Sequence, residues 1–302
     1  MALWIPVTIA AAFAQNLRFM LQKHLKATRL STGGATFARF LYSAPLVAII
    51  LALYVTFSGM EMPRTSARFW AFALTGGLSQ IVATMCVVAI FAHRNFAVGI
   101  TFKKTEVLQA ALVGFVVLGE GLSVLGLAAI VIGFVGLVIL SDAPEATGAW
   151  HRRIFNRAAG LGLASGILFA ISGVGYRGAS LALELGQEDL LLRAIFTLAM
   201  VTAFQTAAMV VWLGFREAGE VTRVARNWRV GALVGLTSMI GSLCWFFAFT
   251  LQTVAYVKAL GQIELVFSFI ASVFVFRERT TLREGLGMVL LVCSILLLIL
   301  AL

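Results

Sequence analysis

Two acidic residues lie deep inside apolar segments of this 302-residue chain. Glu106 stands about 11 residues into one hydrophobic segment, and Glu264 lies at the matching point of another, so at about 1.5 Å per residue each is roughly 16 Å from the segment end. A charge at that depth in hydrocarbon costs from about 2.5 kcal/mol upward, so it normally faces a cavity or a partner. The chemistry open to these carboxyls is binding of a substrate amine or carriage of a proton. The alternative is a buried pair that locks one helix to its neighbour.

Basic and amide side chains accompany both carboxyls. Lys103 precedes Glu106 by three positions, so the two residues share one face of a helix. A face with an ammonium and a carboxylate suits a zwitterion, or an anion that is exchanged with a proton. The competing interpretation is an ion pair within that helix. Lys258 and Gln262 precede the second carboxyl.

The rare residue types of the chain recur at one fixed offset. Four pairs of identical type are separated by 158 positions: Trp70 and Trp228, Cys86 and Cys244, Glu106 and Glu264, Glu120 and Glu278. With 61% hydrophobic residues, apolar types match by chance, but rare types do not. The pattern therefore indicates an internal duplication. The lysines do not repeat, so we interpret the repeated residues as scaffold and the lysines as adapted to an asymmetric ligand.

The composition predicts a membrane protein that carries these residues on helices. Mean hydropathy is +1.00 and only 12% of residues are charged, which excludes an ordinary soluble domain. A bilayer requires hydrophobic stretches of roughly 17 to 25 residues. Ten are predicted, at residues 2–22, 33–57, 69–92, 96–118, 122–140, 159–183, 190–213, 230–250, 254–276 and 282–302. The expected fold class is an all-α integral membrane protein, with ten transmembrane helices as two inverted five-helix repeats around a central cavity.

The predicted organisation is a first five-helix repeat at 1–141, a linker at 142–157 and a second five-helix repeat at 158–302. Because five is odd, two repeats of similar fold enter the membrane from opposite sides. Most lysines and arginines fall in the loops after the odd-numbered segments. The positive-inside rule assigns those loops to the cytoplasm, which predicts a multi-pass protein of the inner (plasma) membrane with both termini periplasmic.

Two further pairs recur near segment ends in both halves. Arg39 and Arg193 stand early in the second segment of each half, and Glu120 and Glu278 follow the fourth. We interpret the arginines as snorkelling toward headgroups, or as closing a gate against an acidic residue of a facing helix. The glutamates are predicted to cap the helix that follows them.

These four residues carry a resemblance to a known family, together with the sequence Leu118-Gly119-Glu120 and the glycines after it, Gly126, Gly133 and Gly136. The pattern resembles the EamA repeat of the drug/metabolite transporter superfamily over nearly the whole chain. The resemblance implies a basket of helices around a central cavity. It also implies export of small metabolites, often amino acids.

The function predicted from the sequence is secondary active transport across the inner membrane by alternating access. The exported substrate is expected to be a small polar metabolite such as an amino acid. The residues expected at the substrate or coupling site are Lys103, Glu106, Glu264, Lys258, Gln262, Trp245 and Tyr256. Trp245 and Tyr256 are included as cavity walls because their polar tips require partners when buried.

No cofactor, metal site or nucleic-acid partner is predicted, and the chain is not expected to be an enzyme. The expected partners are a small-molecule substrate and the lipid bilayer, with protons as a candidate coupling ion. The oligomeric state is left open and is compatible with a monomer. One alternative is a flippase for a lipid-linked substrate on the same fold. Another is an intramembrane lipid-modifying enzyme, against which stands the lack of a nucleophile with a matching base.

Overall fold

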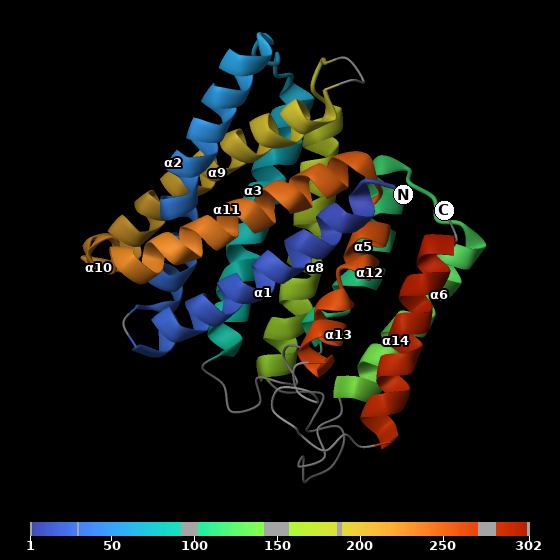
Figure 1. Ribbon diagram of the computed structural model, residues 1–302. Coiled ribbons are helices and arrows are strands. Elements are labelled where there is room, and N and C mark those ends of the chain that lie inside the picture. Colours follow the sequence, from blue (N-terminus) through green and yellow to red (C-terminus); the bar gives the residue numbers. More distant parts are fainter. Residues whose placement is uncertain are drawn as a thin grey trace.

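The computed structural model describes residues 2–28, 30–91, 102–141, 157–185, 189–270 and 282–300. The elements of this part of the chain are helices joined by short connections, and its β-structure is limited to an isolated bridge between Arg64 and Glu184. The helices, labelled in Figure 1, are α1 (Trp4–Thr28), α2 (Thr32–Ser58), α3 (Ala67–Ile90), α5 (Glu106–Leu118), α6 (Val124–Ser141), α8 (Arg157–Leu181), α9 (Leu190–Arg216), α10 (Glu220–Arg226), α11 (Trp228–Leu251), α12 (Val254–Leu260), α13 (Ile263–Ile270) and α14 (Leu282–Leu300). The prediction of an all-α protein is confirmed for the described residues.

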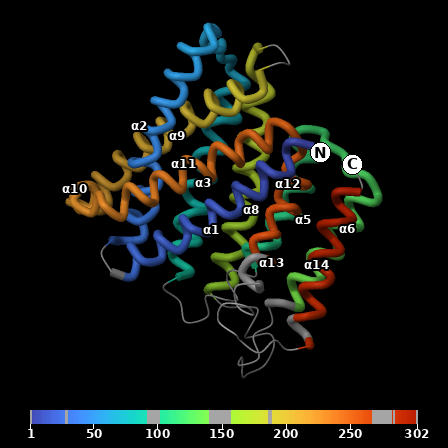
Figure 2. The backbone as a smooth tube through the Cα atoms, viewed as in Figure 1, coloured from blue at the N-terminus to red at the C-terminus, as the bar shows by residue number. Residues whose placement is uncertain are grey.

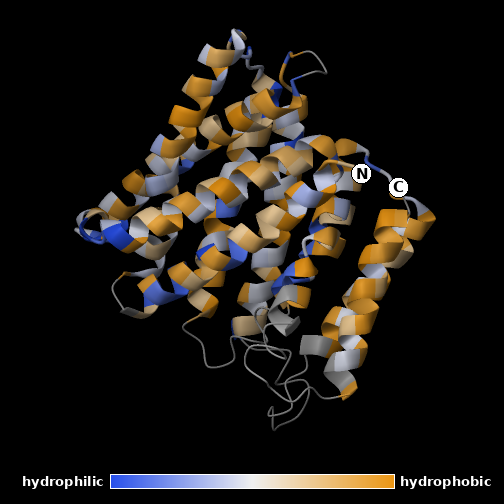
Figure 3. Cartoon of the chain, viewed as in Figure 1, coloured by the Kyte–Doolittle hydropathy of each residue, from blue (hydrophilic) through white to orange (hydrophobic). Residues whose placement is uncertain are grey.

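The helices have the length and surface of membrane-spanning segments. Five of those described, α2, α3, α8, α9 and α11, are long and apolar enough to cross a bilayer by length and composition. Large apolar side chains on them face outward, including Phe57 at 85% and Phe215 at 87% exposure. Such exposure is unfavourable in water but matches a lipid environment. Figure 3 shows apolar residues along most of each helix and hydrophilic residues gathered near α10.

Local sequence signals define the sharp helix ends. The Ser31 hydroxyl accepts a hydrogen bond from the Gly34 amide at 2.8 Å at the start of α2, which satisfies one of the unpaired amides of the first turn. At the other end of α2, Gly59 has φ of 67°. Gly119 has φ of 70° after α5. Glycine adopts this left-handed conformation without steric penalty, so both helices end abruptly.

The two predicted halves are packed against each other along four helix pairs. Helix α1 lies along α11, α3 along α8, α2 along α9 and α6 along α14. The last pair forms one edge of the molecule in Figure 2. At the α3–α8 contact, a Cβ on Gly175 would lie 2.9 Å from the Cα of Gly76, so the two backbones meet where neither residue has a side chain.

The fourth and ninth segments, predicted as continuous helices at 96–118 and 254–276, are interrupted in the described structure. A turn at Lys104 and Thr105 precedes α5, and a turn at Gly261 and Gln262 separates α12 from α13. Tight i→i+3 bonds replace the helical pattern, from the Thr105 amide to the Phe102 carbonyl at 3.2 Å and from the Gln262 amide to the Ala259 carbonyl at 3.1 Å. Short 3₁₀ stretches inside a helix often mark a hinge.

Candidate functional site

Glu106 is the centre of a buried ion-pair network. The residue opens α5, directly after the turn, and is 3% exposed. Its Oε2 lies 3.3 Å from Lys103 Nζ, and its Oε1 lies 2.5 Å from Lys258 Nζ on α12. One carboxylate therefore contacts two ammonium groups from opposite halves of the chain and balances the charge of one of them. The interpretation of a Lys103–Glu106 pair holds in the structure, but the pair also extends to a residue about 150 positions away.

The second deep glutamate forms a reciprocal pair. Glu264, in the first turn of α13, contacts Lys104 Nζ through its Oε1. A carboxylate of the first half thus holds a lysine of the second, and a carboxylate of the second half holds a lysine of the first. Both pairs lie where a helix is interrupted. Gln262 lies at the same turn and its side-chain Nε2 is 3.3 Å from the Lys258 carbonyl.

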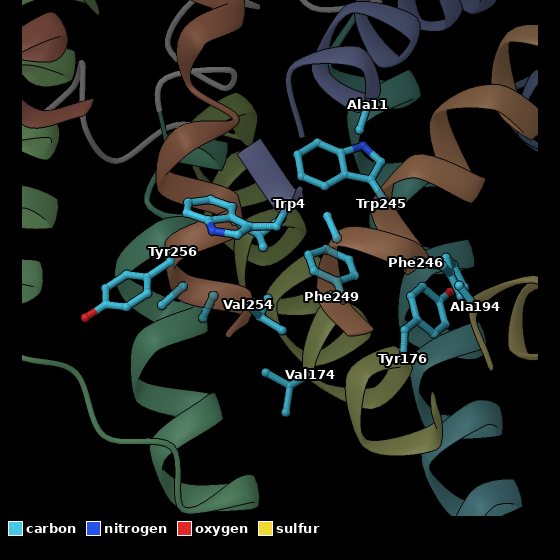
Figure 4. Close-up of a cluster of buried hydrophobic side chains, with 14 of the residues drawn as sticks. Trp4, Ala11, Val174, Tyr176, Ala194, Trp245, Phe246, Phe249, Val254 and Tyr256 are labelled. Atoms are coloured by element: carbon cyan, nitrogen blue, oxygen red, sulfur yellow. The ribbon is translucent and has the colours of Figure 1, made fainter. Parts of the chain in front are cut away.

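Aromatic rings surround the ammonium groups. Lys258 Nζ lies 4.6 Å from the Trp245 ring centroid and 5.5 Å from that of Phe249. Lys103 Nζ lies 5.3 Å from the Phe169 centroid. In Figure 4 the Trp245 and Phe249 rings lie next to each other, with centroids 5.6 Å apart. Ring faces attract cations, more strongly when water is excluded, so these rings hold the lysines in place without neutralising their charge.

A cavity of about 230 Å³ adjoins the network. Lys103, Lys104 and Glu264 line its polar wall, while Phe19, Val87 and Leu265 contribute apolar wall. A smaller space of about 20 Å³, enough for about one water molecule, lies deeper and touches Lys258, Arg39 and Trp245. Of the predicted residues, Lys103 and Glu264 therefore line the larger cavity, and Lys258 and Trp245 line the smaller one.

Comparison with known proteins agrees with this architecture. Residues 156–300 match the profile of the EamA-like transporter family. The match lies in the second half of the chain. The match confirms the resemblance noted from the sequence, so the second half of the chain is similar to a family of membrane transporters. A crystal structure with 16% sequence identity aligns over 98% of both chains at a TM-score of 0.64, which shows the fold alone. No curated protein matches the chain in sequence.

Arg39 is a buried polar residue that connects three helices. It is 3% exposed, so the prediction of snorkelling is wrong for this residue. Its guanidinium donates to the hydroxyls of Ser238 at 3.1 Å, Thr84 at 3.2 Å and Ser242 at 3.3 Å. These contacts join α2 to α3 and α11. The acidic partner expected for a gate is not among its contacts in the described residues.

Arg193 stabilises the end of α8. It is 8% exposed, and its guanidinium donates to the backbone carbonyls of Ser180 at 3.1 Å, Leu183 at 2.8 Å and Leu185. The last carbonyls of a helix have no partner within the helix. The guanidinium therefore supplies a donor to the last turn of α8, at Ser180, and donors to the connection that follows, at Leu183 and Leu185.

We expect Arg193→Gln to destabilise the protein by about 1–3 kcal/mol, because buried carbonyls lose charged donors. Thermal unfolding in detergent would measure the loss, with Arg216→Gln as control because this exposed residue lies on the same helix. Uptake per folded molecule should remain close to that of the wild type. A selective loss of uptake with normal stability would instead assign Arg193 to a gate.

Two other predicted residues, Tyr256 and Glu120, contact neighbouring helices and do not line the larger cavity. The Tyr256 hydroxyl contacts the Ser123 amide at 3.2 Å and its Oγ at 3.1 Å, and in Figure 4 its tip points away from Trp245. Glu120 pairs with Arg177 on α8. The cap of α6 is instead Ser123, whose Oγ accepts from the Gly126 amide at 3.0 Å. Glu278 lies outside the described residues.

Sequence reasoning did not select three polar groups of this interior. Lys104 was noted only as a non-repeating lysine, although it holds Glu264. Gln205 bridges Gln80 at 2.9 Å and the Tyr176 hydroxyl at 3.1 Å. Glutamine inside a predicted span is a usable signal, because an amide buried in hydrocarbon requires partners. Arg18 of α1 is the third missed group, and it is buried.

Gly166 of α8 lies against the turn that precedes α5. A Cβ at this position would lie 2.8 Å from Gln109 Oε1, 3.1 Å from the Lys103 carbonyl oxygen and 3.4 Å from the Glu106 amide nitrogen. Helix α8 therefore touches the turn that carries the network only because this residue has no side chain.

We expect Gly166→Val to displace the turn, lowering stability by about 1–3 kcal/mol as overpacking does and reducing transport. Gly160→Val is the matched control, because Gly160 lies on the same helix with nothing within 4 Å of its Cβ position. Uptake assays and thermal unfolding of both variants provide the comparison. Equal behaviour of the two valine variants would show that the turn tolerates movement and does not position the network.

Proposed function

We propose that this protein is a secondary transporter that moves a small polar metabolite by alternating access through the polar interior between its halves. The observation that carries the proposal is the reciprocal pair of buried ion pairs, Lys258 with Glu106 and Lys104 with Glu264, next to a cavity of about 230 Å³. Buried ion pairs contribute little net stability. Their placement where two helices are interrupted supports a role in binding or switching.

The ion pairs give the proposed transporter a two-state element. Each pair joins the halves, so separating the halves on one side of the membrane requires at least one pair to open. A charged substrate that replaces one partner lowers the cost of opening, since it compensates the buried charge that is left. The interrupted helices supply hinges at the same depth. Transport then follows from exchange of partners at the network.

The proposal includes ten spans arranged as two inverted repeats. Four helix pairs support it, because a two-fold relation between the repeats exchanges the α1–α11 contact with the α3–α8 contact and maps α2–α9 and α6–α14 onto themselves. The two helix interruptions, at residues 104–105 and 261–262, are separated by almost the 158-residue offset of the duplication, which also supports the two repeats. The predicted boundaries at 1–141, 142–157 and 158–302 belong to the same proposal.

The proposed direction of transport and the proposed membrane location rest on the sequence and on the family resemblance. Excess basic residues in the loops after odd-numbered segments support an inner-membrane location with periplasmic termini. Both termini lie near each other at the same end of the molecule in Figure 1, which is compatible with that arrangement. Amino acid export and coupling to protons are proposals that follow from the family resemblance and from the deep carboxyls.

Uptake into proteoliposomes that contain only this protein tests the function. Radiolabelled amino acids, organic acids and polyamines are presented inside and outside, and we expect saturable exchange of at least one class that Glu106→Gln abolishes. Movement of a fluorescent lipid-linked probe alone would identify the flippase alternative. Conversion of a substrate without movement would identify an enzyme and contradict the proposal.

A further inference from the structure

Arg18 is a buried guanidinium without an acidic partner. It lies on α1 and is 3% exposed. Its Nε and Nη2 atoms have no hydrogen-bond partner in the described part of the chain. The contact that remains is with the neighbouring Phe19 ring, 4.5 Å from the guanidinium carbon to the centroid. A buried charge without hydrogen bonds or a counter-charge is among the least favourable arrangements in a protein, so it indicates that a partner is missing.

A second unpartnered donor faces the same space. Arg18 and Trp245 both line a narrow crevice between α1 and α11, which has no room for a water molecule in this conformation, so a ligand enters only when the crevice widens. The Trp245 Nε1 atom is buried and has no hydrogen-bond partner among the described residues. Indole and guanidinium groups donate hydrogen bonds and accept none. The group that would satisfy both is therefore an acceptor with several lone pairs, which is the character of an oxyanion.

The charges around this space have the same sign. Arg39 and Lys258 line the adjacent cavity, which shares Gln15, Ser242 and Trp245 with the crevice at Arg18. Arg18 is near enough to Arg39 and Lys258 for electrostatic repulsion with both. Three basic groups therefore converge on one set of small spaces.

The carboxylates of the network do not balance these cations. The described polar interior holds five basic side chains, Arg18, Arg39, Lys103, Lys104 and Lys258, and two carboxylates, Glu106 and Glu264. Both carboxylates are already in ion pairs with lysines. Arg18 and Arg39 are left with no carboxylate among the described residues, and the formal excess is three positive charges. An incoming ammonium would compete for occupied carboxylates, whereas an incoming oxyanion would find unpaired cations.

We propose that the transported substrate is a small organic anion whose carboxylate or phosphoryl group binds Arg18 and Trp245 Nε1, with Arg39 and Lys258 behind it. This inference rests on the transport function proposed above and narrows it from polar metabolites to those with net negative charge. The planar fork of Arg18 binds two oxyanion oxygens at once, which lysine does not reproduce. A zwitterion with no net charge would leave the excess positive charge uncompensated.

Thermal unfolding of the purified full-length protein tests the site with defined probes. The probes are succinate and glycerol 3-phosphate as anions, succinamide as the neutral control, glutamine and leucine as zwitterions, and putrescine as a cation. We expect one or both anions to raise the melting temperature by about 5 °C near saturation, because a ligand that binds only the folded state stabilises it by mass action. The other probes should have no effect.

The Arg18→Met variant separates binding from structure. Because it removes an uncompensated buried charge, the ligand-free variant should melt at or above the temperature of the wild type, while the shift caused by the anions disappears. Arg18→Lys should keep part of the shift, because charge remains but the fork is lost. Arg68→Met is the matched control, since this exposed arginine lies outside the polar interior and should keep the full shift. A lower melting temperature for ligand-free Arg18→Met would overturn the inference by assigning Arg18 a structural role.

Uptake of the same probes into proteoliposomes distinguishes the two levels of the proposal. Transport of succinate or glycerol 3-phosphate, lost in Arg18→Met, supports the anion site. Transport of the zwitterions or of putrescine but of neither anion would overturn the inference and leave the transport function standing. Transport of no probe by protein that retains its helical circular dichroism would count against the transport function and the anion site together.

Discussion

Glu106→Gln is expected to abolish transport and to destabilise the protein by about 3–5 kcal/mol, because removal of one partner of a buried pair leaves uncompensated charge behind. Here one carboxylate serves two ammonium groups, at 3.3 Å from Lys103 and 2.5 Å from Lys258. The loss is measured as a fall in melting temperature and as the uptake rate of reconstituted protein. Glu61→Gln is the matched control, because Glu61 is exposed in the connection between α2 and α3.

A second variant separates the role in stability from the role in transport. Glu106→Gln combined with Lys258→Met removes both members of the closer pair, and replacing a whole buried pair by neutral groups is often neutral for stability. The double variant should therefore recover part of the melting temperature, because Lys103 alone is left without its carboxylate, but none of the uptake. If it also recovers uptake, the pair serves only to join α5 to α12, and the carboxyl has no part in the transport cycle.

The deep carboxyls could be predicted from sequence because their signal is local. Glu106 and Glu264 are rare types in apolar segments and recur at the offset of the duplication. Their ion-pair partners were harder to predict from the sequence. Lys258 and Lys104 reach them from the opposite half of the chain, and helical spacing relates only residues within about one turn. The prediction therefore found the Lys103–Glu106 contact and missed the Lys104–Glu264 contact.

The interrupted helices show the same limit. Gly261 is a local signal of a break, since glycine weakens a helix. The turn before α5 has no such signal, because Lys103, Lys104 and Thr105 are compatible with a helix. That turn depends on tertiary contacts, in particular on Gly166 of α8 against the Lys103 carbonyl. A packing contact that far away in the sequence does not appear in a pattern of hydropathy.

The arginines were misjudged because depth along a helix does not specify which way a side chain faces. Arg39 lies about two turns from the start of α2, where a side chain on the lipid side would reach the headgroups, and Arg18 lies nearly three turns from the end of α1. Helix α1 packs along α11, and α2 packs along α9 and α11, so both guanidiniums turn inward and are buried. Tyr256 shows the converse, since its hydroxyl does find a partner but on α6's first turn rather than in the cavity.

Glu264→Lys is expected to reduce transport to below about a tenth of the wild-type rate. It would place a second ammonium against Lys104. Like charges in contact cost several kcal/mol, and 1.4 kcal/mol already corresponds to a tenfold change in rate. Glu264 borders the cavity of about 230 Å³, so this variant should lose less stability than Glu106→Gln, whose surroundings exclude water. Melting temperature and uptake rate would again be measured side by side.

The charge-swapped variant, Lys104→Glu with Glu264→Lys, decides what this second pair does. If the pair acts as an electrostatic latch between the halves, the swap restores the attraction, and uptake should return to at least about a third of the wild-type rate, which leaves a deficit well under 1.4 kcal/mol. If a carboxylate is required at position 264 itself, to hold a proton or a substrate group, the swap remains inactive although the protein folds. Lys104 and Glu264 lie at the two helix interruptions. Recovery in the swap would therefore indicate that these turns carry the opening movement, and that the substrate binds at Arg18 and Arg39 instead.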